Sequence, residues 1–138
     1  MPPCPECGID ESRIGVPDAI PALRGFPRRY RSAVEAASDA HESAVATAGV
    51  AAFTTDLRAG IRDLAGALGH DVPASSAGRD LAALEELSDA AATLAERVPW
   101  DAWDRPAPHG GVPAREILAR LAHRGAHHLR SITRALPD

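Results

Sequence analysis

Apolar residues recur every three or four positions along most of this 138-residue chain. That spacing places them on one side of an α-helix, whereas a half-buried strand alternates apolar and polar residues at every second position. Four segments carry such helical stripes, and no segment has the alternation of a strand. The sequence therefore predicts an all-α protein, a four-helix bundle with an irregular N-terminal segment.

Proline and glycine set the expected helix boundaries, because neither residue favours a helix interior. Residues 1–26 are rich in both, and we expect them to form an irregular segment packed on a bundle of residues 27–138, within a single domain. Thr54 or Thr55 would cap the second helix, and Gly69 would end it. The expected helices run from Pro27 to Thr47, from Thr55 to Leu68, from Ala77 to Arg97 and from Pro113 to Leu136.

Charge and hydropathy exclude two classes of partner. The chain has 15 basic residues, all of them arginine, against 19 acidic ones, and its net charge of −4 argues against a general nucleic-acid-binding protein. No apolar run approaches the roughly 20 residues that span a membrane, and the N-terminus lacks the pattern of a signal peptide. We therefore expect a cytoplasmic protein that binds neither nucleic acid nor membranes.

The two cysteines, Cys4 and Cys7, form a CxxC pair in "MPPCPECG" near the N-terminus. In a cytosolic chain this spacing indicates metal binding or thiol redox chemistry rather than a structural disulfide. A thioredoxin-like motif requires strands around it, and none is expected here. Metal binding is the interpretation that we develop.

A matching pair of ligands lies at the other end of the chain. His123 and His127 in "LAHRGAHHLR" are separated by one helical turn, on the side of the last helix that faces away from its apolar stripe. Alone, they could be two solvated histidines. Together with Cys4 and Cys7 they complete a Cys2His2 set, which binds zinc in a closed tetrahedral site. The sequence thus predicts a zinc ion that joins the two ends of the chain.

The remaining candidates have structural and functional interpretations. His128 lies on the apolar stripe of the last helix and is expected to be buried or half-buried with a hydrogen bond. His41 lies on the inward stripe of the first expected helix, and either histidine could join the metal site. Trp100 and Trp103 would close one end of the bundle or form a contact surface. A redox switch, in which the cysteines release zinc on oxidation, also remains open.

Several of these features resemble the DinB/YfiT-like superfamily. The fourth-helix "LAHRGAHHL", the opening "MPPCPECGID", the stretch "AIPALRGFPRRYRSAV" and the tryptophan pair resemble an actinobacterial branch of it. The resemblance implies a four-helix bundle, a homodimer, and a divalent metal bound by a second-helix histidine and the fourth-helix HxxxH pair. Some members are transferases or isomerases that use mycothiol or bacillithiol, which implies a small-molecule thiol as a candidate partner.

The resemblance assigns His123 and His127 to the metal but leaves the second-helix ligand missing. This chain reads "AGIRDLAG" there, with Gly60 at or near the ligand position. If both cysteines replace the missing histidine, all four positions of the metal are filled and the site is structural. The protein would then have a binding or stress-related role without metal catalysis. The alternative is a thiol-dependent metal enzyme with an open position.

Overall fold

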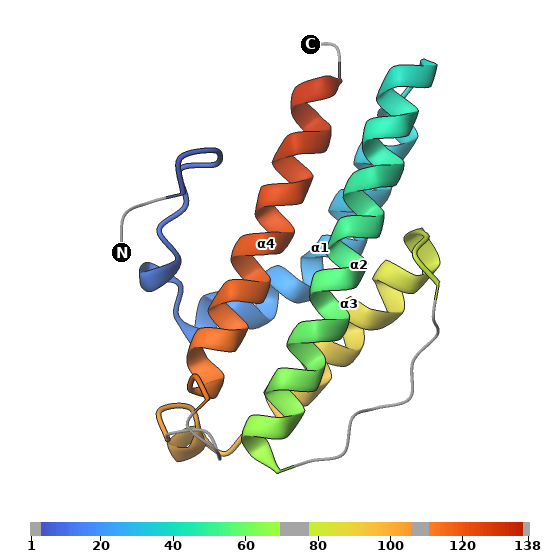
Figure 1. The fold of residues 1–138 in the computed structure, drawn as a ribbon. Helices are drawn as coiled ribbons and strands as arrows, with labels where there is room; N and C mark the ends of the chain where they lie inside the picture. The colour runs from blue at the N-terminus through green and yellow to red at the C-terminus, as the bar shows by residue number, and fades with distance from the viewer. Residues whose placement is uncertain (1–3, 70–77, 106–110, 137–138) are drawn as a thin grey trace.

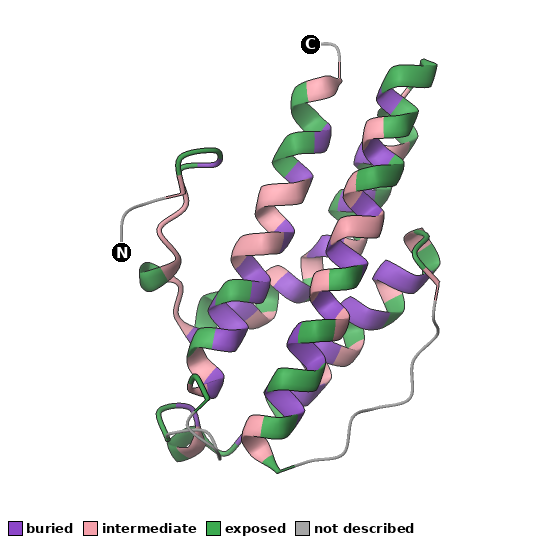
Figure 2. Ribbon diagram, viewed as in Figure 1, coloured by how far each residue is buried: buried purple, intermediate pink, exposed green. Residues whose placement is uncertain are grey.

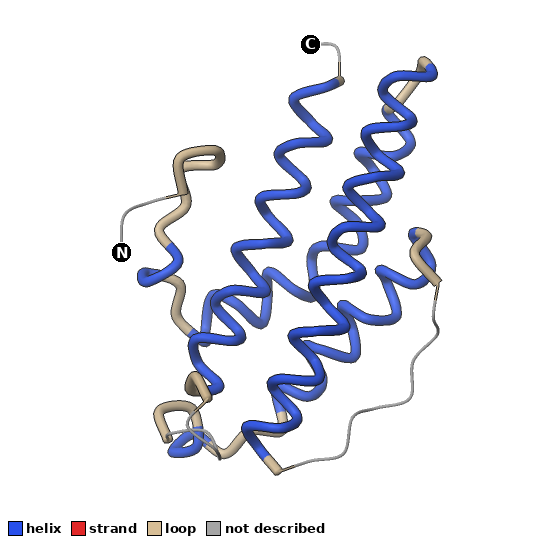
Figure 3. Tube along the Cα trace, in the orientation of Figure 1, coloured by secondary structure: helices blue, strands red, loops and turns tan. Residues whose placement is uncertain are grey.

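A computed structural model describes residues 4–69, 78–105 and 111–136, and helices dominate it (Figures 1 and 3). The described residues contain no strand, which confirms the predicted all-α four-helix bundle. The elements are η1 (Glu11–Arg13), α1 (Val16–Ala36), α2 (Ala40–Leu68), α3 (Leu81–Glu96), η2 (Trp100–Ala102) and α4 (Ala114–Ala135).

The packing of the helices leaves one side of α4 free for the N-terminal segment. Helices α1 and α2 each pack against both α3 and α4. Buried positions line the inner sides of the helices, as Figure 2 shows. Residues 4–15, which we call the N-terminal arm, run along the outer side of α4, and η1 contacts that helix (Figure 1). Of the described helices, none is long and apolar enough to cross a bilayer.

The first helix begins earlier than the sequence predicted. Helix α1 starts at Val16 and includes Pro21 and Pro27 in its interior, so the expected irregular segment of residues 1–26 is wrong from residue 16 onward. An interior proline removes one backbone hydrogen bond. Burial on both sides of Pro27 outweighs that loss, because the stripe of buried residues is continuous across it. This stripe comprises Val16, Ala19, Leu23, Phe26, Tyr30 and Ala33.

The predicted break at "TAGVAAF" is also wrong. Helix α2 passes through it, because Val50 and Phe53 continue a buried stripe from Ala46 to Leu57. The break between helices lies at residues 37–39 instead, where the Asp39 carboxylate accepts a hydrogen bond from the backbone N–H of Glu42. The predicted caps Thr54 and Thr55 therefore lie inside the helix. Gly69 does end it, in the left-handed conformation (φ 69°).

The last two helices agree closely with the sequence. The third predicted stripe is buried throughout: Leu84, Leu87, Ala91, Leu94 and Val98. Helix α3 begins at Leu81, after an Asp80 cap, and the predicted start at Ala77 lies outside the described residues. Helix α4 follows Pro113 and ends one residue before the predicted Leu136.

Two of the single-residue predictions are corrected. His41 is exposed in the first turn of α2, so its predicted place on an inward stripe is wrong; the chain turns just before it, at residues 37–39. Trp103 is buried in the core, as expected of a residue that closes the bundle. Trp100, at the start of η2, is 75% exposed and does not share that role.

An aromatic cluster fixes where α4 lies. The rings of Phe26, Tyr30 and Phe53 pack against one another with centroids 5.3–6.0 Å apart. The Tyr30 hydroxyl donates a hydrogen bond of 2.5 Å to the backbone carbonyl of Gly125, and burial raises the pKa of that hydroxyl well above its usual range. Since Gly125 lies midway between His123 and His127, these contacts with the core also set the position of the two histidines.

Candidate metal centre

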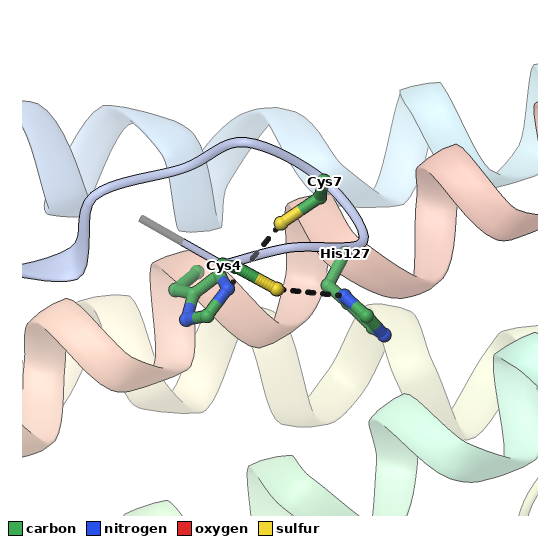
Figure 4. Close-up of side chains that lie close together, drawn as sticks. Cys4, Cys7 and His127 are labelled. Carbon is green, nitrogen blue, oxygen red and sulfur yellow. Dashed lines mark hydrogen bonds between the residues drawn. The ribbon is translucent and has the colours of Figure 1, made fainter. Parts of the chain in front are cut away.

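A tight turn in the N-terminal arm presents both cysteines on one side. The Gly8 N–H donates to the Cys4 carbonyl at 2.7 Å, and the Cys4 N–H donates to the Ile9 carbonyl at 2.8 Å. Gly8 has φ 73°, a conformation that residues with a side chain rarely adopt. Cys4 is half-buried and Cys7 is buried, and both are free thiols. Figure 4 shows Cys4 and Cys7 directed at the face of α4 that carries His127.

Helix α4 supplies the two imidazoles. His123 and His127 are one turn apart, with side chains 14% and 12% exposed and ring centroids 6.1 Å apart. The outward face on which the sequence placed them is covered by the arm, which explains their low exposure. Arg134 donates to the Glu6 carbonyl at 2.8 Å and Arg130 to the Cys7 carbonyl at 3.5 Å, so α4 also holds the arm by its backbone.

The four predicted ligand residues meet at one point. Cys7 Sγ is 3.4 Å from His123 Nε2, and Cys4 Sγ is 3.8 Å from His127 Nδ1. One ligand atom from each of the four residues lies within 4.8 Å of all the others. In a tetrahedral zinc site the bond lengths imply a sulfur–nitrogen separation of about 3.6 Å. These four side chains could therefore hold a metal ion.

The electrostatics of the two thiols differ. Backbone N–H groups of Cys7 and Glu6, with the neighbouring side chains of His123 and Cys7, lower the pKa of Cys4 to about 6. Burial raises the pKa of Cys7. Because thiolates are the metal-binding form of cysteine, a bound cation would displace any proton that either sulfur carries.

Each imidazole uses its second nitrogen to contact a carboxylate of the arm. His123 Nδ1 lies 3.1 Å from Glu11 Oε1, and His127 Nε2 lies 3.0 Å from Glu6 Oε2. The sequence analysis missed both glutamates. Their position on the same short segment as the CxxC pair was the only available signal, and it does not reveal which nitrogen each carboxylate reaches.

Protein-family models, curated proteins and solved structures gave no match to this chain.

Gly60, where the resemblance would place a second-helix ligand, packs against a core side chain of α4. A Cβ atom at Gly60 would lie 2.4 Å from Leu121 of α4, so the backbone of α2 approaches that leucine closely. His41 and His128 do not belong to the four-residue group. No third histidine thus joins His123 and His127 in the described residues.

His128 instead forms a separate polar cluster beside the core. As predicted, it is half-buried and hydrogen-bonded: its Nε2 lies 2.7 Å from Asp56 Oδ2, and Arg124 Nε donates to the same oxygen at 3.1 Å. Burial opposes ionisation of Asp56, but the hydrogen bonds and charges of His128 and Arg124 outweigh it and lower the pKa of this carboxyl.

We expect Asp56 to contribute to acid stability. A carboxyl whose pKa is depressed on folding stabilises the protein above its unfolded pKa of about 3.9, and this contribution is lost as the pH falls through the folded value. In metal-free protein, Asp56→Asn should cost about 1 kcal/mol in urea unfolding at pH 6, and the difference should shrink below about pH 4. The exposed Asp63 of the same helix provides the control, Asp63→Asn. A constant difference across this pH range would contradict the assignment.

Proposed function

We propose that this protein is a zinc-binding helical bundle in which a Cys2His2 site has a structural role, tying the N-terminal arm to α4. The observation that carries the proposal is the pair of sulfur–nitrogen distances, 3.4 and 3.8 Å, between residues 116 and 123 positions apart in the chain. Two thiolates and two imidazoles form one of the common ligand sets for zinc.

A structural role follows from the number and charge of the ligands. Four protein ligands complete the tetrahedral shell of zinc and leave no position for water or a thiol substrate. Two thiolates also neutralise the two charges of the ion, which weakens its action as a Lewis acid. The protein would therefore act in binding rather than in metal catalysis. The thiol-dependent transferase suggested by the DinB-like resemblance would need one of the four ligands to leave.

Metal analysis tests the proposal directly. We expect about one zinc per chain in protein purified without chelator, and less than about a tenth of that in Cys4→Ser and His127→Ala. His41→Ala is the matched control, since His41 is exposed and outside the cluster. The contacts could instead be thiolate–imidazole hydrogen bonds without a metal. Protein that neither contains zinc nor takes it up on titration would establish that alternative and overturn the proposal.

A further inference from the structure

The two histidines of the cluster turn different ring nitrogens toward the sulfurs. His123 directs Nε2 at Cys7, whereas His127 directs Nδ1 at Cys4. We propose that zinc is bound by Nε2 of His123 and by Nδ1 of His127. Glu11 is a positioning residue that keeps Nε2 of His123 directed at the metal and thereby strengthens zinc binding. The inference rests on the proposed zinc site and adds its ligation mode and an affinity-determining residue.

The choice of nitrogen follows from the hydrogen bonds on the far side of each ring. A neutral imidazole has one N–H and one lone pair, and the group that accepts from the N–H decides which nitrogen remains free for a metal. The Glu11 carboxylate can accept a hydrogen bond but has no proton to donate. It therefore accepts from an N–H at Nδ1 of His123, and the lone pair of that ring lies on Nε2. At His127 the carboxylate of Glu6 is near Nε2, which leaves the lone pair on Nδ1.

Glu11 is held in place by its own short helix. The Asp10 carboxylate caps η1, accepting from the Ser12 backbone N–H at 3.1 Å and from its hydroxyl at 2.5 Å. The Glu11 side chain is only 16% exposed, and its second oxygen lies 4.0 Å from Arg120 Nε of α4. Glu11 therefore contacts α4 with both oxygens and has little freedom to leave His123.

Glu6 makes a contact of the same length but in a different environment. Its side chain is 71% exposed, and water competes with His127 for its oxygens. We expect the two glutamates to contribute unequally, although each lies about 3 Å from a ligand imidazole. This difference makes Glu6 a matched control for Glu11.

Zinc affinity provides the first test. In a competition titration of the full chain against a zinc chelator, Glu11→Gln should weaken zinc binding about tenfold, the lower end of the usual effect for carboxylates that orient metal-bound histidines. Glu6→Gln should weaken it about twofold. Since the arm contributes little to the core, both variants should keep the wild-type helical circular dichroism. Equal effects of the two variants, or none for Glu11→Gln, would overturn the role of Glu11.

Histidine NMR provides a readout that a merely structural role of Glu11 would not change. In the ¹⁵N-labelled zinc-bound protein, long-range ¹H–¹⁵N spectra should show His123 protonated at Nδ1 and His127 at Nε2. In Glu11→Gln the signals of His123 should shift or broaden while those of His127 stay in place. Zinc bound through Nδ1 of His123 would overturn the inference and leave the proposed function intact. If the wild-type protein bound no zinc, the proposed function itself would fail.

Discussion

Chelation of zinc is expected to lower the midpoint of thermal unfolding by roughly 10 °C. An ion stabilises the folded chain by about 4 kcal/mol when its dissociation constant is a thousandfold lower than its free concentration. In a protein of this size each kcal/mol corresponds to about 3 °C. The proposed site takes ligands from both the arm and α4, which are separated by most of the chain, so unfolding would release the ion.

The measurement is thermal unfolding followed by circular dichroism, with and without excess chelator. In Cys4→Ser the two curves should coincide, at the midpoint of the chelated wild-type protein. His41→Ala should behave as wild type. Helical content at 20 °C should not change on chelation, because the buried core begins at Val16 and does not include the cysteines. A wild-type midpoint that is the same with and without chelator would contradict a structural zinc.

The fold class and the two pairs of candidate ligands could be predicted because their signals are local in sequence. The stripe from Leu84 to Val98 and the capping position of Gly69 depend on residues a few positions apart. Likewise, CxxC and HxxxH each place two ligands on one side of a turn or helix, whatever the rest of the chain does. Such patterns survive in the folded protein because tertiary contacts reinforce them.

The helix boundaries between Gly15 and Thr55 could not be predicted from such signals. Pro27 and the "TAGVAAF" segment argue locally for breaks, but burial of Phe26, Tyr30 and Phe53 in one aromatic cluster stabilises the helices that contain them. Tertiary packing thus overrode local preference. The break lies at residues 37–39 instead, where Asp39 caps α2; the sequence analysis did not identify this cap.

The surroundings of the candidate site likewise could not be predicted from the spacing of residues in the sequence. Glu6, Glu11 and Asp56 reach their histidines only because the arm lies along α4 and because α2 packs on its other side. The distance in sequence is 112 residues between Glu11 and His123 and 72 between Asp56 and His128. Only the folded arrangement shows which carboxylate meets which ring.

Gly125→Ala is expected to destabilise the protein by about 1–3 kcal/mol. A Cβ atom at this position would lie 2.3 Å from Phe26 Cε2 and 2.7 Å from Phe53 Cζ, inside the aromatic cluster. These rings pack against each other and against Tyr30, so neither can move away without disturbing the others. Alanine favours helix over glycine by about 1 kcal/mol, and the overpacking must exceed that gain. Urea unfolding of metal-free protein measures the difference.

Gly66→Ala is the matched control. Gly66 lies in the exposed part of α2, and a Cβ atom there would have no neighbour within 4 Å, so the substitution should stabilise the protein by up to about 1 kcal/mol. The change in the free energy of unfolding should have opposite signs in the two variants. Equal stabilisation of both would contradict the close approach of α4 to the aromatic cluster.

Successive residues of a helix are rotated by about 100°, so Gly125 lies about 160° around α4 from both His123 and His127. Folded Gly125→Ala protein should therefore still bind zinc, because the core and the metal site use opposite sides of the same helix.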